Sequence, residues 1–377
     1  MKSRMNKLMS LCLVAMMGTT LIPQPIQAEE VSEFEEATVE YEEATFEEEK
    51  NQVAESNSEK TYTETFDYRD LKYGVTDPNA KTVEVIGFAD GYYPTEPTGY
   101  RLWITETVSK QDESDKEYTV TSIGKSAFAG CSSIEDIQFP DSLKIIGKSA
   151  FESCTNLLGV PQWSENLKTI GESAFKNCWQ LSYVHLPKGL ETIKRSAFER
   201  CVKLTDVNLS KGLKTIEDSA FKDCNNLGYI YLPEGLETIG ESAFDLLPNE
   251  FYDPCLSRIN IPSTVKELNY IFGKNSDDHT VTSPFKENSA LFFHGDELPI
   301  IDSDFFNLLS VGKNKPIIYF PENAMETYAG EKSPFVKAGL INPEFFDSYY
   351  EVINYALKMD EMILLIFLDW MHLIDRS

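Results

Sequence analysis

Apolar residues recur along the middle of the chain with a period of about 23 residues. Between consecutive Ala-Phe pairs the pattern is Ala-Phe-x-x-Cys-x-x-Leu-x-x-Val-x-Leu-Pro-x-x-Leu-x-x-Ile-Gly-x-Ser. A fixed period of this length is typical of a solenoid in which each repeat forms one turn. The intervals are 23, 24, 23, 23 and 23 residues, and the pairs end at Phe128, Phe151, Phe175, Phe198, Phe221 and Phe244.

Each repeat predicts two extended arms joined by a corner. In residues 181–186 the pattern Leu-x-x-Val-x-Leu points Val and the second Leu inward and Tyr183 outward, because successive side chains alternate across a strand. Pro187 has no N–H to donate and ends this strand. Residues 190–193 form a second short arm, and Phe198 fills the core at the corner. One turn cannot bury these side chains alone, so neighbouring turns must stack into a continuous core.

Three turns depart from this pattern. In the second turn Pro161 directly follows Val160, which predicts a shortened or bulged strand. Ser210 replaces the strand-ending proline in the fourth turn. After Phe244, residues 245–253 form an insert that delays the next Leu-x-x-Ile-x-Ile-Pro segment. The pattern indicates a loop there and assigns it no purpose.

Cysteine recurs once in each repeat. Adjacent turns lie about 4.8 Å apart, but stacked side chains point in parallel, so we expect free thiols acting as small buried hydrophobic groups. No Cys-x-x-Cys spacing predicts a metal site. Cys255 directly precedes Leu256 instead of standing three residues before a Leu, so it falls outside the column and is the candidate reactive thiol. The five column positions are Cys131, Cys154, Cys178, Cys201 and Cys224.

The N-terminus has the pattern of a Sec signal peptide. Three basic residues precede an apolar stretch at 8–22, and Ala28 supplies a small residue before the expected cleavage site. The apolar run is too short for a membrane anchor. These features predict that residues 1–28 are removed on export.

The segments outside the repeats and their flanks differ in charge. Residues 29–60 contain 13 Glu and two Lys with no Gly, Pro or Cys, which predicts an acidic disordered spacer. Residues 343–377 include a seven-residue apolar run at 362–368 that is too short to cross a bilayer. We expect this tail to be helical and to pack on the preceding domain.

The charge balance excludes several classes of partner. The 377 residues include 34 Lys and Arg against 61 Asp and Glu, a formal net charge of -27. A chain this acidic is repelled by nucleic acids and by anionic membrane surfaces. The sequence therefore predicts neither a nucleic-acid partner nor a transmembrane span, and it gives no indication of the oligomeric state.

Catalytic chemistry has little support in the sequence. Motifs such as Gly-x-Ser-x-Gly and His-Glu-x-x-His are absent, as is a phosphate-binding glycine loop. Acidic pairs such as 277–278, or Asp302 with Asp304, fit solvated turns better than a general acid and base. We predict no enzyme, no cofactor and no catalytic or metal-binding residue. The four histidines are scattered along the chain, at His185, His279, His294 and His372.

The repeat motif carries a family resemblance. Its Ser-Ala-Phe-x-x-Cys-x-x-Leu spacing over six turns resembles the BspA-like (Treponema pallidum-type) leucine-rich repeat family of secreted and surface proteins. Residues 82–88 and 100–104 resemble that family's N-terminal β cap, and residues 292–295 and 317–321 its closing turn. The resemblance implies an α/β solenoid, a right-handed leucine-rich repeat of about six 23-residue turns with parallel β-strands on the concave face, capped at both ends.

The predicted organisation follows from these segments. We expect an N-terminal β cap at 61–118, the leucine-rich repeat solenoid at 119–273 and a C-terminal capping turn at 274–342. The concave strand surface is the candidate site, because such surfaces bind proteins or glycans and tyrosine buries a large area at low entropic cost. Exposed tyrosines also suit strands in general, and both interpretations stay open. The candidate partner-binding patch is Tyr183, His185, Asp206, Asn208, Tyr229 and Tyr231.

The resemblance implies a secreted or cell-surface protein that binds host or microbial partners without catalysis, in adhesion or protein–protein interaction. An extracellular protein or a glycan is the expected ligand. Two alternatives remain: a structural envelope or matrix protein without a specific ligand, and an envelope-associated glycan hydrolase whose site lies in the loops.

Overall fold

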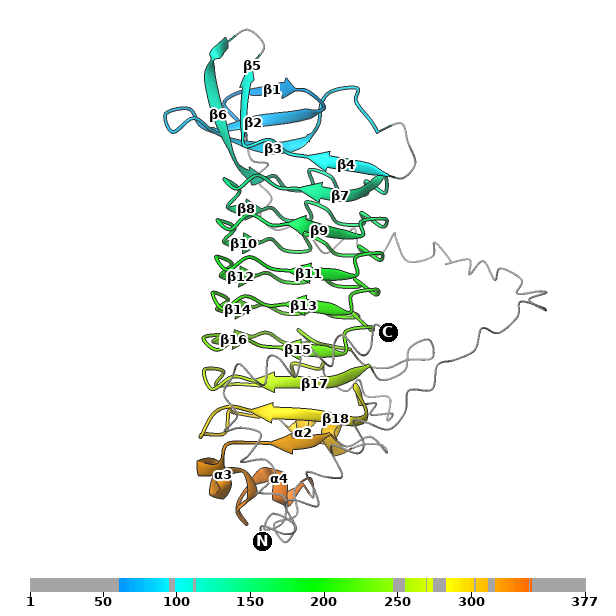
Figure 1. Ribbon diagram of the computed structural model, residues 1–377, viewed down its shortest axis with the longest axis vertical. Coiled ribbons are helices and arrows are strands. Elements are labelled where there is room, and N and C mark those ends of the chain that lie inside the picture. The colour runs from blue at the N-terminus through cyan, green and yellow to red at the C-terminus, as the bar shows by residue number, and fades with distance from the viewer. Residues whose placement is uncertain are drawn as a thin grey trace, which may run out of the picture. The chain divides into compact units, whose positions relative to one another are not determined.

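The structure is a computed structural model whose elements are nearly all β-strands, stacked along the repeats (Figure 1). The predicted signal peptide, acidic spacer and C-terminal tail lie outside the described residues. The structure describes residues 61–94, 99–110, 113–246, 255–268, 270–273, 283–301, 303–310, 316–338 and 340.

The N-terminal strands precede the first repeat. β1, β2 and β3 are antiparallel neighbours, β3 pairs in parallel with β6, and β5 pairs antiparallel with β6. β4 instead pairs in parallel with the first long strand of the repeats, β7. The bounds are β1 Thr65–Tyr68, β2 Leu71–Asp77, β3 Thr82–Phe88, β4 Tyr100–Trp103, β5 Thr107–Lys110 and β6 Glu113–Ile123.

Each regular repeat contributes one strand to each of two layers, and the strands within each layer of the repeats are parallel (Figure 1). The short-strand layer continues from β6 and comprises β8 Ile145–Ile146, β10 Thr169–Ile170, β12 Thr192–Ile193, β14 Thr215–Ile216 and β16 Thr238–Ile239. The long-strand layer begins at β4 and comprises β7 Ile134–Gln138, β9 Gly159–Gln162, β11 Tyr183–His185, β13 Asp206–Asn208, β15 Tyr229–Tyr231, β17 Leu256–Ile261, β18 Phe285–Phe293 and β19 Ile317–Tyr319. Its ladder of strand pairs is interrupted between β13 and β15, although these two strands remain in contact.

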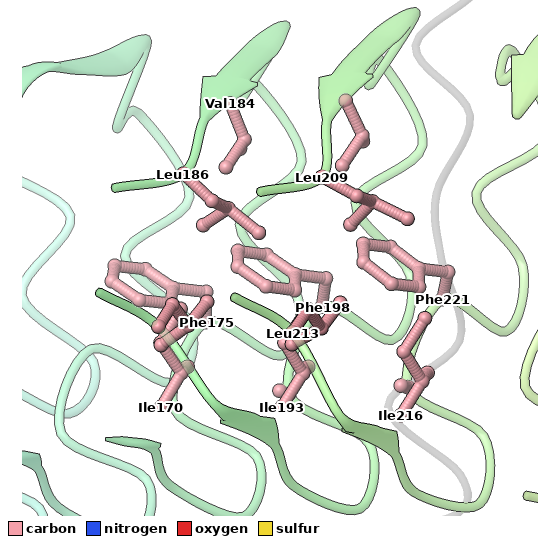
Figure 2. Close-up of a cluster of buried hydrophobic side chains, with 14 of the residues drawn as sticks. Ile170, Phe175, Val184, Leu186, Ile193, Phe198, Leu209, Leu213, Ile216 and Phe221 are labelled. Carbon is pink, nitrogen blue, oxygen red and sulfur yellow. The ribbon is translucent and has the colours of Figure 1, made fainter. Parts of the chain in front are cut away.

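One phenylalanine per repeat fills the space between the two layers. The six rings, from Phe128 to Phe244, are almost completely buried. Consecutive rings lie 5.2–5.4 Å apart with interplanar angles of 1–13°. Figure 2 shows Phe198 in this stack, between Leu186 of the long-strand side and Ile193 of the short-strand side. The predicted continuous core is therefore confirmed.

The Ser-Ala-Phe corners form a third set of contacts between repeats. At one corner the backbone N–H of Ser196 donates to the Asp218 carbonyl (2.9 Å) and that of Phe198 to the Ala220 carbonyl (2.8 Å). The left-handed conformation costs a residue other than glycine about 1–2 kcal/mol, so these hydrogen bonds offset local strain. The corner serine has φ of 54–57° in all six repeats, at Ser126, Ser149, Ser173, Ser196, Ser219 and Ser242.

The 24-residue interval places its extra residue in β9. Asp136 is paired with Gly159, but Gln138 is paired with Gln162, so β9 uses one residue more than β7 over the same length. The bulged alternative predicted for this strand is therefore correct, and the shortened one is not. Trp163 is buried at the position that leucine takes in regular repeats.

Helices are confined, among the described residues, to the C-terminal end. The repeats use turns where other leucine-rich repeats have helices. The predicted fold class, a leucine-rich repeat solenoid with parallel strands, is confirmed, and its helical part is small. The helical elements are α2 Ser303–Ser310, the 3₁₀ helix η2 Glu322–Ala324, α3 Met325–Ala329 and α4 Pro334–Lys337.

Candidate functional site

Two rows of side chains run across the outer face of the long-strand layer. Strand pairing sets the rows, and the repeat pattern continues them from β13 to β15 and, in the second row, from Gln162 to His185. The first row is Arg101, Asp136, Gly159, Tyr183, Asp206, Tyr229, Arg258, Ala290 and Ile317. The second row is Trp103, Gln138, Gln162, His185, Asn208, Tyr231, Asn260, Phe292 and Tyr319.

The predicted patch lies on three consecutive strands of this face, β11, β13 and β15. Asp206 is half-buried, and the other five residues of the patch are exposed. The rings of Tyr183 and His185 lie 5.8 Å apart on β11. Tyr183 also lies over Gly159, where an added Cβ would come within 2.9 Å of its ring. The Tyr183 ring thus packs against the backbone of the neighbouring strand β9. The role of the patch in binding stays a prediction.

Asn260 belongs to the second row, where alternation along the strand would place it outward, yet it is buried. Asn260 is only 4% exposed, and its side chain accepts a hydrogen bond from the Leu232 backbone N–H and donates one to the Leu232 carbonyl, both at 2.8 Å. These two hydrogen bonds of the Asn260 side-chain amide continue the pairing of β15 with β17 by one residue beyond Tyr231. Asn260 is therefore part of the scaffold and is not available to a ligand.

The sequence prediction missed apolar residues at both ends of the rows. Trp103 is 67% exposed on β4, and Ile317 is 54% exposed on β19. The Phe292 and Tyr319 rings stack with 4.5 Å between centroids and an interplanar angle of 8°. Extending the outward positions of the repeat back into 100–104 and forward into 290–293 and 317–320 would have found them.

The cysteine column is a structural feature of the interior. All six cysteines in the described residues are free, and four column thiols are buried while Cys131 at the start is half-buried. Each buried thiol donates to the carbonyl of the preceding repeat's phenylalanine, for example Cys178 Sγ to Phe151 at 3.2 Å. Burial raises the pKa of Cys178 well above its usual range. The expectation of small buried groups without disulfides is confirmed.

Cys255 differs from the column in its contacts. It is half-buried, and its thiol lies 3.5 Å from the Leu227 carbonyl instead of from a phenylalanine carbonyl. Burial raises its pKa to about 11, which lowers the fraction of reactive thiolate at neutral pH. The structure therefore shows no enhancement of thiolate formation at Cys255, and its role as the candidate reactive thiol stays a prediction.

The histidines do not form a common site among the described residues. His185 is exposed on β11, while His294 Nδ1 lies 3.2 Å from Glu234 Oε1 and Ser263 Oγ donates to the same carboxylate at 3.0 Å. His279, His372 and the acidic pair at 277–278 lie outside the described residues. Within the described ranges no group of three or more His, Cys, Asp or Glu could hold a metal ion, and no helix is long and apolar enough to cross a membrane.

Charged side chains on the repeats are paired from one turn to the next. Residues 121–272 carry 15 Lys and Arg and 19 Asp and Glu, so the solenoid has only a small part of the negative charge. Six cations each contact a carboxylate 23 or 24 residues later at 2.7–3.4 Å. The pairs are Lys148–Glu172, Lys168–Glu191, Lys176–Glu199, Arg195–Asp218, Lys214–Glu237 and Lys222–Asp245.

The repeats match a known family. The model of the BspA-type leucine-rich repeat region matches residues 110–162 and 161–278, in six copies. Residues 110–278 therefore belong to the BspA-type leucine-rich repeat family, and the resemblance drawn from the motif is confirmed. Members of this family are typically not enzymes, and membership is consistent with a role in protein binding.

Solved structures of leucine-rich repeat proteins are similar to this chain. A leucine-rich repeat protein of T. pallidum is 19% identical, with 72% of this chain and 92% of that chain covered and a TM-score of 0.35. One from Bacteroides ovatus is 23% identical, with 69% of each chain covered and a TM-score of 0.38. A leucine-rich cell surface protein from Faecalibacterium prausnitzii is 17% identical, with 73% and 75% covered and a TM-score of 0.39. No curated protein matches the chain.

Proposed function

We propose that the protein is a secreted or cell-surface binding protein that recognises a host or microbial protein or glycan without catalysis. The outer face of the long-strand layer is the proposed contact surface. The signal-peptide pattern at residues 1–28 supports export. The face offers an extended array of side chains on a rigid hydrogen-bonded scaffold, which suits recognition better than chemistry.

One observation carries this proposal. Ten large hydrophobic side chains are exposed in the described residues, and half of them lie on the two rows of this face. Exposed aromatic side chains gathered on one surface are typical of binding sites, because they bury a large area while their polar atoms keep hydrogen-bonding capacity. The five residues are Trp103, Tyr183, Tyr229, Tyr231 and Ile317.

Capture of partners by the purified chain tests the proposal. The chain without its signal peptide is immobilised and exposed to extracellular matrix proteins, serum proteins and mucin glycans. We expect saturable binding of at least one component, and replacement of Tyr183, Tyr229 and Tyr231 together with Ser should reduce it at least about tenfold, since central aromatic contacts dominate interfaces.

A matched variant tests whether the loss of any exposed tyrosine, and not only one on the outer face, reduces binding. Tyr93 is 79% exposed and lies outside both rows, so Tyr93→Ser should bind like the unmodified chain. Undiminished binding by the triple variant would remove the outer face from the proposal. A chain that captures nothing but assembles with itself would favour a matrix role, and turnover of a glycan or peptide substrate would favour the hydrolase alternative.

A further inference from the structure

Arg258 on β17 is held in a three-layer stack at the C-terminal end of the outer face. Its guanidinium carbon lies 5.2 Å from the centroid of the Phe292 ring, and the Phe292 ring stacks on Tyr319. A guanidinium placed over an aromatic ring is stabilised by the negative face of the ring. The stack restricts the side chain to one orientation, so less conformational entropy is lost when a ligand binds it.

Arg258 has no ion pair with any residue that the structure describes. It differs in this from six Lys and Arg of the repeats, each of which contacts a carboxylate of the next turn. Arg101, at the opposite end of the same row, lies 3.7 Å from the carboxylate of Asp136. Arg258 is thus a cation of the outer face whose stacked position on Phe292 leaves its N–H groups for an external anion.

Aromatic rings lie beside Arg258 on the neighbouring strand. Tyr229 is directly opposite Arg258 in the strand pairing and is 43% exposed, and Tyr231 on the same strand is 58% exposed. A tyrosine ring offers a flat apolar face together with a hydroxyl group. The cluster therefore combines one cation with apolar surface, which fits a ligand that has a carboxylate on a partly apolar ring.

We propose that this end of the outer face binds an acidic sugar, with Arg258 contacting the carboxylate and Tyr229 and Tyr231 contacting the sugar ring. The proposal rests on the binding function given above. An extended peptide cannot add to β17 as a strand, because both edges of β17 are paired, with β15 and with β18. A peptide rich in Asp and Glu is also repelled by the acidic chain, whereas an acidic sugar carries one carboxylate among neutral hydroxyls.

Isothermal titration calorimetry with defined probes tests this assignment. The probes are 3′-sialyllactose, digalacturonic acid and neutral lactose, titrated into the chain without its signal peptide. We expect at least one acidic sugar to bind and lactose not to bind. Arg258→Gln should weaken binding by at least about tenfold, because it removes charge-assisted hydrogen bonds, which are stronger than neutral ones. The affinity of Arg258→Lys should lie between those of the unmodified chain and Arg258→Gln, because lysine keeps the charge and loses the planar donors.

The control is Arg200→Gln, which removes an exposed cation that lies outside both rows and should leave binding unchanged. Unaltered melting curves establish that the variants are folded. Binding of sialyllactose alone identifies a sialic acid as the ligand, and binding of digalacturonic acid alone identifies a uronic acid. Binding of both identifies a site that recognises only the carboxylated ring that the two sugars share.

Four results would overturn the assignment: no binding of either acidic sugar, equal binding of lactose, unchanged binding by Arg258→Gln, or binding of a hexaglutamate peptide alone. If the acidic sugars fail while the triple tyrosine variant still loses its captured partner, the sugar assignment falls and the binding function stands. If neither experiment shows a loss, both fall.

Discussion

The regular repeats and the turns that follow Phe244 pack their aromatic residues differently. From Phe128 to Phe244 the core rings are almost parallel, with interplanar angles of at most 13°. Beyond the insert, the Phe272 and Phe285 rings meet at 76°. The strands there are also longer, with six residues in β17 and nine in β18, and aromatic rings stack on the outer face as well as in the core.

This difference separates the requirement for stable stacking of the core from the requirement for recognition of a partner. In the core of the regular repeats every position faces the same position of the next turn, so its residue type must stack well on itself. The atypical turns are free of that condition, and they carry Arg258, Phe292 and Tyr319. We infer that the inward positions of the regular repeats provide the stable scaffold, that their outward positions provide part of the recognition surface, and that the atypical turns add Arg258 to it.

The largest expected effect concerns the core rings. Phe198→Ala removes a fully buried ring that stacks on Phe175 and Phe221, and it should lower the free energy of unfolding by about 3–5 kcal/mol. Phe292→Ala removes a half-buried ring on the outer face and should cost less than half as much. Denaturant unfolding measures both, and equal losses would show that the outer stack is as much a part of the core as Phe198.

The regular part of the fold could be predicted from the sequence because identical positions recur. The inward phenylalanines, the two arms of each repeat and the bulge beside Pro161 all follow from spacing and from the missing N–H of proline. The left-handed serines could not be predicted. Their conformation is imposed by hydrogen bonds to the following turn, as for Ser196 with Asp218, and local propensity gives no sign of it.

The second effect compares two thiols. Thiolate is the reactive form, and a pKa of about 11 for Cys255 should make its alkylation at pH 8 about 100-fold slower than that of an unfolded thiol. Burial raises the folded-state pKa, so the rate should increase as pH rises towards 11. Cys178 is fully buried and should react only when the chain unfolds. Mass spectrometry of alkylated peptides at several pH values checks both, and fast labelling of Cys255 at pH 7 would confirm it as a reactive thiol.

The candidate site could be predicted only in part. Tyr183, Tyr229 and Tyr231 follow from alternation along a strand, which fixes the outward positions. The same rule failed for Asn260, because its amide is used to bond the Leu232 backbone. It also gave no reason to group Arg258 with Phe292, because the spacing between them reflects the longer atypical turns and not the repeat.

The smallest effect concerns the ion pairs between turns. Lys168 and Glu191 lie 2.7 Å apart and both side chains are about half exposed, so their coupling should be only about 0.2–1 kcal/mol. A double-mutant cycle of Lys168→Gln and Glu191→Gln, measured by denaturant unfolding at low salt, gives this value.

The same cycle in about 0.5 M salt should give a coupling close to zero, because exposed charges are screened. Arg101→Gln with Asp136→Asn on the outer face provides the comparison, since that pair is longer, at 3.7 Å, and Arg101 is 85% exposed. Its coupling should be smaller than that of Lys168 with Glu191 at low salt. A larger coupling for the Arg101 pair would mean that outer-face charges also order the turns, and the division between scaffold and recognition surface would then fail at the N-terminal end.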